Sequence, residues 1–274
     1  MQMVSFEELL EAGVHFGHLK RKWNPAMAPY IFMEKGGIHI IDLHKTAAKL
    51  EEAAAAAKQI AKSGRRILFV ATKKQAKEIV AEKVQAVGMP YVTERWSGGM
   101  LTNFPTIRKA VKKMNTIEKM MTDGTFDQLS KREKLQITRQ KDKLEKNLGS
   151  IADMSKTPAA LFVVDVLKEK IAVKEAHRLN IPVFGMVDTN SDPNSVDFVI
   201  PANDDAAKSI SIVLDVITKA ISEGLAERKS DKDNADNQKG QNAGQKRGNK
   251  TRARKGGNNE KANADKPAEA PAQE

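Results

Sequence analysis

The residues best suited to chemistry gather in a ten-residue stretch, Arg95–Phe104. It contains a guanidinium, an indole, a glycine pair and a side-chain amide, at Arg95, Trp96, Gly98, Gly99 and Asn103. Guanidinium groups bind phosphates, indole rings stack on unpaired bases, and glycines let the backbone approach a ligand closely. This stretch, called the joint below, predicts a surface site for phosphate and base contacts, with RNA as the expected ligand.

A second candidate is the first loop, residues 15–25, where three successive basic residues lie between two histidines and a tryptophan. Its Gly and Pro residues predict irregular structure. Basic side chains suit phosphates, and aromatic rings suit base stacking. An alternative of equal weight places His15 and Trp23 in the core and leaves the basic run solvated. The candidate RNA contacts in this loop are His18, Lys20, Arg21, Lys22, Trp23 and Asn24.

A metal site is the weaker interpretation of these histidines. No carboxylate or third histidine lies close to His15 and His18 in sequence to complete a ligand set. The run Asp188–Asp192 offers oxygen ligands for a cation, but the same residue types are common in turns and caps, and that interpretation is favoured. We therefore expect no metal ion and no cofactor.

An enzymatic function finds little support. After the first buried strand the chain continues Thr72-Lys73-Lys74-Gln75, which matches neither a dinucleotide-binding fingerprint nor a phosphate loop. Asp165 and Asp188 follow predicted strands at the edge where open sheets place ligands, yet no catalytic arrangement accompanies them. A fold alone does not establish catalysis. The chain is expected to be a binding protein, and the rivals are a basic α/β enzyme or a dimerising adaptor.

Composition favours a polyanionic partner. The 274 residues include 46 basic and 35 acidic side chains, which give a formal net charge of +11. A hydrophobic content of 40% is enough for a folded core. The absence of cysteine excludes disulfides and thiolate metal sites. No signal peptide or membrane-spanning run is recognisable, so the cytoplasm is the expected location.

Alternating strands and helices must position these residues. Five apolar runs of strand length are interleaved with helical patterns and predict an α/β fold with a doubly wound, mostly parallel five-stranded sheet. Ser5 and Glu8 predict a capped N-terminal helix, and Asp42 caps a helix that continues to Ser63. A β-hairpin precedes this helix, with its turn at Gly36 and Gly37. The five strands are expected at residues 67–71, 91–93, 160–164, 183–187 and 198–200.

Residues 102–154 change to a helical period and interrupt the α/β pattern. Apolar residues step by threes and fours from Ile107 to Met121 and again from Ile137 to Ile151, with a break at Asp123-Gly124. This pattern predicts an inserted antiparallel coiled-coil helical hairpin. Many lysines and arginines surround its seam and a glycine-rich joint borders it, so the hairpin is expected to project from the domain rather than to be absorbed in its core. The alternative is a dimerisation arm.

From residue 229 the chain is polar and of low complexity. It holds 11 basic and 7 acidic residues, so +7 of the net charge belongs to residues 1–228. Such a composition predicts a disordered tail that contributes flexible phosphate contacts. The predicted segments are the N-terminal helix and basic loop (1–29), the first part of the α/β domain (30–101), the inserted hairpin (102–154), the second part of the α/β domain (155–228) and the tail (229–274).

Four motifs together resemble the bacterial small-subunit ribosomal protein S-two family. They are the stretches 9–18, 23–25, 95–103 and 158–165, and they read LLEAGVHFGH, WNP, RWSGGMLTN and PAALFVVD. The resemblance runs in order from the N-terminus to about Lys229, and the tail lies outside it. One mild departure is Ser97, where the family is expected to carry a larger apolar residue.

The resemblance implies a non-enzymatic structural component of the small ribosomal subunit. It implies an α/β domain with a protruding hairpin. It also implies that the protein binds ribosomal RNA and neighbouring small-subunit proteins. One of these neighbours is the large ribosomal protein that captures messenger RNA. Carried over motif by motif, the expected RNA-binding residues are His18, Lys20, Arg21, Lys22, Trp23 and Asn24 in the first loop, and Arg95, Trp96, Asn103 and Arg108 at the joint.

Overall fold

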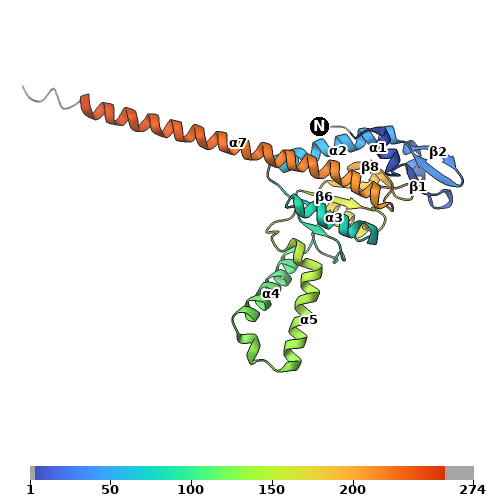
Figure 1. Ribbon diagram of the computed structural model, residues 1–274, viewed down its shortest axis with the longest axis horizontal. Coiled ribbons are helices and arrows are strands. Elements are labelled where there is room, and N and C mark those ends of the chain that lie inside the picture. The colour runs from blue at the N-terminus through green and yellow to red at the C-terminus, as the bar shows by residue number, and fades with distance from the viewer. Residues whose placement is uncertain (1–3, 257–274) are drawn as a thin grey trace, which may run out of the picture. The chain divides into compact units, whose positions relative to one another are not determined.

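The computed structural model describes the backbone of residues 4–256 and the side chains of residues 4–126 and 128–231. The chain divides into two compact units, residues 1–228 and 229–274. The first unit is built on a five-stranded sheet in the order β5-β4-β6-β7-β8, and every neighbouring pair is parallel. The predicted α/β class and strand set are confirmed (Figure 1). The strands are β4 (Ile67–Val70), β5 (Tyr91–Val92), β6 (Ala160–Val164), β7 (Val183–Val187) and β8 (Phe198–Pro201).

The sheet separates two apolar layers. β4, β6 and β7 are buried along their whole lengths, as expected for parallel strands covered on both faces. On one face they pack against α2 (Leu43–Lys62), α3 (Lys74–Ala86) and the start of α7 (Ala207–Gly256). On the other face they pack against α6 (Lys170–Arg178), the joint and the base of the hairpin. This second face, called the joint face below, carries the candidate residues of the joint.

A smaller antiparallel sheet precedes the large one. Its order is β1-β3-β2, formed by β1 (Phe16–Leu19), β2 (Ile31–Lys35) and β3 (Ile38–Ile41). The predicted hairpin is present, and both turn glycines have positive φ. The predicted caps are also present: Ser5 and Glu8 form a capping box on α1 (Phe6–Glu11), and Asp42 caps α2.

The first loop is more regular than the sequence predicted. Residues 16–19 form β1, and the basic run forms a short 3-10 helix, η1 (Lys20–Lys22). A second 3-10 helix, η2 (Pro25–Tyr30), follows. Strand pairing between β1 and β3 supplies the long-range hydrogen bonds that the local sequence does not reveal. The prediction of irregular structure was therefore wrong for residues 16–22.

The inserted segment contains two contacting helices, α4 (Phe104–Thr122) and α5 (Lys131–Leu148), connected through η3 (Thr125–Gln128). Figure 1 shows them side by side, joined at the end away from the sheet. Val111, Met114, Ile117 and Leu148, all expected at the seam, are buried. A capping box at Ser130 starts α5. The helix pair matches the predicted hairpin, whereas its coiled-coil character stays a prediction.

The polar tail forms a unit of its own, residues 229–274. Helix α7 is assigned as far as Gly256, and the disorder expected from residue 229 stays a prediction. The remainder of the predicted tail, residues 257–274, lies outside the described residues. Within the described part of the chain, no helix combines the length and apolarity needed to span a membrane.

Candidate nucleic-acid interface

The joint is held by a single buried carboxylate, Glu175 of α6. Its Oε1 accepts hydrogen bonds from Trp96 Nε1 at 3.2 Å and from the Gly99 N–H at 2.7 Å. Its Oε2 accepts from the N–H groups of Leu101 and Thr102, at 3.0 and 3.1 Å, and from the Thr102 hydroxyl at 3.2 Å. Five donors thus converge on one side chain that is 8% exposed.

This arrangement keeps Glu175 ionised. Burial alone would raise the pKa of its carboxyl group, but the hydrogen bonds from Thr102, Gly99 and Leu101 outweigh burial and lower the pKa. An ionised carboxylate accepts stronger hydrogen bonds than a neutral one. Glu175 therefore fixes the path of the joint, including Gly99, whose φ of 84° favours glycine.

Trp96 lies in the core rather than at the surface. Its side chain is 7% exposed and packs in the apolar layer of the joint face. Its Nε1–H group donates a hydrogen bond to Glu175. The expectation of a surface indole at this position was wrong, because a tryptophan can bury its ring when its N–H finds a partner. Trp96 shapes the joint from below, and a base stack on its ring would require the joint to open.

The remaining candidates at the joint and at the start of α4 are either exposed or bonded to the protein backbone. Arg95 and Asn103 are exposed, and Asn103 Oδ1 accepts a hydrogen bond from the Thr106 hydroxyl at 2.8 Å. Arg108 is half-buried, and its Nη1 donates to the carbonyls of Ala152 and Met154 at 3.2 and 3.0 Å. Arg108 thereby ties the start of α4 to the chain that follows α5. Arg95 and Asn103 remain available to a ligand.

In the first loop, Arg21 and Lys22 are exposed at the surface. Lys20 forms an ion pair with Glu34 of β2, with 2.6 Å between Nζ and Oε2. Such exposed pairs contribute little stability, so a phosphate could displace this one at small cost. All three basic residues are therefore positioned to meet a polyanion.

Trp23 and Asn24 have structural contacts. The Trp23 ring lies 5.1 Å from the ring of His39, between centroids, and is half-buried. The Asn24 N–H donates to the carbonyl of Thr189 at 2.8 Å, and Asn24 Oδ1 accepts from the Ala26 N–H at 3.0 Å as the cap of η2. The alternative that placed Trp23 toward the core is partly supported, since one side of the residue packs on β3.

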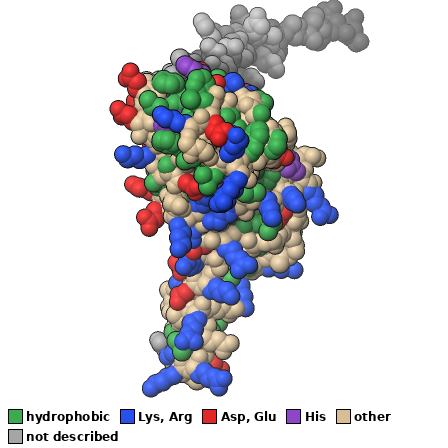
Figure 2. All heavy atoms as spheres, turned by 90° about the vertical axis from the view of Figure 1, so that its right-hand side faces the viewer, with side chains coloured by type: hydrophobic (Ala, Val, Ile, Leu, Met, Phe, Trp, Pro, Cys, Tyr) green, Lys and Arg blue, Asp and Glu red, His purple; other side chains and the backbone are tan. Residues whose placement is uncertain are grey.

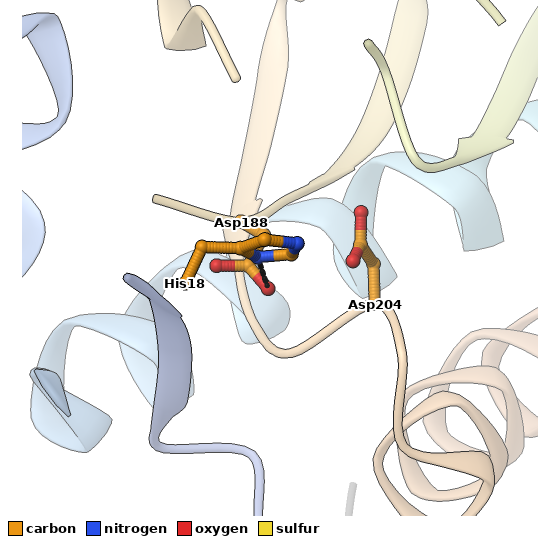
Figure 3. Close-up of side chains that lie close together, drawn as sticks. All are labelled: His18, Asp188 and Asp204. Atoms are coloured by element: carbon orange, nitrogen blue, oxygen red, sulfur yellow. Dashed lines mark ion pairs between the residues drawn. The ribbon is translucent and has the colours of Figure 1, made fainter. Parts of the chain in front are cut away.

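His18 belongs to a charged cluster at the carboxyl edge of the large sheet. Its Nδ1 lies 3.0 Å from Asp188 Oδ2, and its Nε2 lies 3.4 Å from Asp205 Oδ2. The hydrogen bond with Asp188 raises the pKa of His18, although burial opposes the shift. Figure 3 shows the imidazole, carried by β1, beside Asp188 at the end of β7. The two ring nitrogens of His18 thus both face carboxylate groups.

Lys73 links the acidic members of this cluster. Its Nζ lies 3.0 Å from Asp165, 2.7 Å from Asp204 and 2.8 Å from Asp205. Burial and the charges of Asp188 and Asp165 raise the pKa of Asp204 to about 7, although Lys73 opposes this shift. Lys73 thus compensates part of the negative charge at the edge where an open sheet places ligands.

His18, Asp188 and Asp204 could hold a cation. Each offers one ligand atom, and these atoms lie within 4.8 Å of one another. Asp204 is fully buried, and its Oδ2 has no hydrogen-bond partner. One imidazole nitrogen and two carboxylate oxygens form a donor set that zinc accepts. Sequence analysis missed this group because the carboxylates follow His18 by more than 150 positions.

A comparison with protein families identifies the family of this chain. The model of the family described as "Ribosomal protein S2" matches residues 9–224. The chain belongs to the ribosomal protein S2 family. The match includes all four motifs of the sequence analysis and ends before the polar tail. The predicted resemblance is therefore confirmed, and the contacts above describe a chain of the S2 family.

Curated relatives support the same assignment. The chain is 71% identical over 236 residues to "Small ribosomal subunit protein uS2" of Parabacteroides distasonis, which covers 86% of this chain and 85% of the relative. It is 72% identical over 232 residues to the protein of that name from Bacteroides thetaiotaomicron, covering 85% and 84% of the two chains. The corresponding protein of Azobacteroides pseudotrichonymphae is 72% identical over 231 residues, with 84% and 88% covered.

In this S2-family chain the structure unites only part of the predicted site. Arg95 and Asn103 share the joint, and Arg21 and Lys22 share the first loop, all exposed. Trp96 and Arg108 support the joint from within, while His18, Trp23 and Asn24 pack beside the carboxyl edge of the sheet. Glu175 is the residue that sequence analysis missed at the joint. No local signal marks it, because all its partners lie more than 70 positions away.

Proposed function

We propose that this chain is a structural component of the small ribosomal subunit that binds ribosomal RNA and neighbouring ribosomal proteins and performs no catalysis. Membership of the ribosomal protein S2 family carries the proposal. The curated relatives, which are small-subunit proteins by name, cover most of the chain. The protein neighbours include the large messenger-capturing ribosomal protein that the sequence resemblance implied. The chain would support assembly of the subunit and translation.

Charge supports RNA as the main ligand. Residues 1–228 carry a net +7, and the exposed basic residues of the first loop and the joint add to those of the hairpin. Figure 2 shows lysine and arginine side chains spread over the hairpin, with a few acidic side chains among them and further acidic side chains along the left side of the same view. Basic side chains that meet phosphates release counterions, which makes binding strongly dependent on salt.

The residues proposed for direct contact follow from exposure. Arg21, Lys22 and Arg95 would pair with phosphates, and Asn103 would hydrogen-bond to a base or a sugar. Lys20 would join them by exchanging Glu34 for a phosphate. The remaining candidates act through position: Arg108 and Trp96 hold the joint, and His18, Trp23 and Asn24 hold the first loop against the sheet.

Sedimentation of cell lysate through sucrose gradients tests the proposal. The chain is expected to migrate with small subunits at low salt and to be released as salt rises, because an electrostatic interface weakens with ionic strength. A quadruple variant, Arg21→Gln, Lys22→Gln, Arg95→Gln and Asn103→Ala, is expected to be released at lower salt. Recovery of the wild-type chain only in light soluble fractions at low salt would contradict the ribosomal assignment.

A further inference from the structure

The segment around α6 carries charges of both signs in its sequence. Residues 167–180 read LKEKIAVKEAHRLN, with two glutamates interspersed among three lysines and an arginine. Mixed charges of this kind are typical of a solvated helix face with internal ion pairs. Nothing in the sequence distinguishes this helix from the other amphipathic helices of the chain.

The fold removes both acidic residues from the surface. Glu169 is 4% exposed and accepts hydrogen bonds from the N–H and the hydroxyl of Thr72, the former at 3.0 Å. Glu175 is 8% exposed and is occupied by the five donors of the joint. Both carboxylates point into the protein, where neutral donors rather than lysines of α6 satisfy them.

The outward face of the segment is therefore purely basic. The exposed charged side chains are Lys168, Lys170, Lys174 and Arg178. Lys168 Nζ donates to the Thr72 carbonyl at 3.1 Å. The other three form no ion pair with any side chain that the structure describes. They recur every four residues and so form one stripe, with successive members separated by about 6 Å along the helix axis.

The position of this stripe connects it with the proposed RNA contacts. α6 covers the joint face of the sheet, in the same apolar layer as Trp96 and the base of the hairpin. Glu175 lies on the buried side of α6 and accepts hydrogen bonds directly from the backbone of the joint. The stripe and Arg95 are thus carried by elements that are bonded to each other.

We infer that the outward face of α6 is a further RNA-contact surface, which binds the phosphate backbone of ribosomal RNA through Lys170, Lys174 and Arg178. The inference rests on the proposed function and extends it to a surface outside the predicted motifs. Phosphates suit a row of unpaired cations, whereas lysine is depleted in protein interfaces. The exposed apolar residues Leu167 and Ile171 flank the stripe and offer their surface to ribose and base edges.

The test compares two charge-reversed double variants of the full chain. Lys170→Glu with Lys174→Glu changes the stripe. Lys208→Glu with Lys219→Glu makes the same change in charge at exposed lysines of α7, on the opposite face of the sheet. Affinity for full-length small-subunit ribosomal RNA is measured over a series of salt concentrations. Circular dichroism and thermal melting verify that each variant folds.

The stripe variant is expected to lose about tenfold or more in affinity, and its salt slope is expected to fall by about 2, since each phosphate contact contributes about 1 to that slope. The α7 variant is expected to stay within about threefold of the wild type with an unchanged slope. A Lys170→Arg, Lys174→Arg variant should bind like the wild type, because the charge is kept.

Other outcomes separate this inference from the proposed function. If the stripe variant binds RNA as tightly as the wild type and with the same slope, the inference is wrong while the proposed function stands. The same holds if it binds RNA normally but no longer sediments with small subunits, which would indicate an acidic protein partner. If the wild-type chain neither binds the RNA nor sediments with small subunits, the proposed function is wrong, and the inference that rests on it is wrong as well.

Discussion

At the scale of single residues, Glu175 shows how one carboxylate can organise a whole loop. It lies 76 positions after Gly99 and yet accepts hydrogen bonds from both ends of the joint. Its donors include three backbone N–H groups that no strand or helix satisfies. A buried N–H without a partner is costly, so the carboxylate stabilises the joint mainly by preventing that cost.

Replacing Glu175 by Gln is expected to destabilise the protein by about 2–4 kcal/mol, because the amide offers one acceptor oxygen and turns its NH2 group toward other donors. Urea unfolding at pH 7 measures the loss. Glu51→Gln, at an exposed position of α2, serves as control and should lie within about 0.5 kcal/mol of the wild type.

The effect of Glu175 should also depend on pH. Its pKa is lowered in the folded state, so its contribution is complete above the ordinary glutamate pKa of about 4.3 and is lost as pH falls through the folded-state value. The difference in stability between wild type and Glu175→Gln is therefore expected to shrink below about pH 4. A difference that is constant from pH 7 to pH 3 would show that the charge has no role.

The group formed by His18, Asp188 and Asp204 predicts cation binding. Zinc added to the apo protein is expected to raise the melting temperature, because an ion that binds only the folded state stabilises it. Asp204→Asn and His18→Ala should abolish the rise, whereas His44→Ala, on the exposed side of α2, should keep it. An equal rise in all the variants would place zinc elsewhere on the chain.

At the scale of elements, the hairpin depends on contacts at its base. Val111, Leu148 and Ile151 pack with the joint face of the sheet, and Arg108 bonds the two ends of the insertion together. Farther from the sheet, the helices rely mainly on each other. The base is therefore expected to set the direction in which the basic arm leaves the α/β core.

Arg108→Ala is expected to cost about 1–2 kcal/mol, since two carbonyls lose a charged donor at a half-buried site. Hydrogen exchange should accelerate for residues 149–154 more than for β6. Lys109→Ala, one position further along α4 and exposed, should change neither quantity measurably. Equal exchange in both variants would show that Arg108 does not secure the base.

At the scale of the whole molecule, charge is unevenly divided between the units. Residues 229–274 carry +4 of the +11, while the α/β core, including its hairpin, carries the rest. Within the first unit, tertiary burial of Glu169 and Glu175 concentrates positive charge on the joint face. The large sheet thus separates a face suited to RNA from the face covered by α2, α3 and α7.

Removing residues 229–274 is expected to weaken RNA binding and to reduce its salt dependence, because several phosphate contacts are lost. The melting temperature of the first unit should stay nearly constant, as its core lies in residues 1–228. A full-length variant with glutamine at six clustered basic positions of the tail separates charge from length. The six replaced positions are Lys246, Arg247, Lys250, Arg252, Arg254 and Lys255. If the truncated chain and the glutamine variant both bind RNA as tightly as the wild type, the tail takes no part in binding.

Local patterns in the sequence determined most of the fold. The caps at Ser5 and Asp42, the turn at Gly36 and Gly37, and the continuous apolar strands act over a few residues, so each could be predicted from its neighbours. The four motifs also determined the family, since their order and residue types are specific. Basic residues in the first loop and the joint were likewise visible as candidates.

Only the tertiary structure decided what these side chains do. Burial of Trp96, the bonds from Arg108 to Ala152 and Met154, and the approach of Asp188 to His18 all join residues that lie far apart in sequence. The same holds for the face of α6, which becomes basic only because the sheet and the joint draw its glutamates inward. Sequence sets which charges a segment contains, but packing decides which of them meet the solvent.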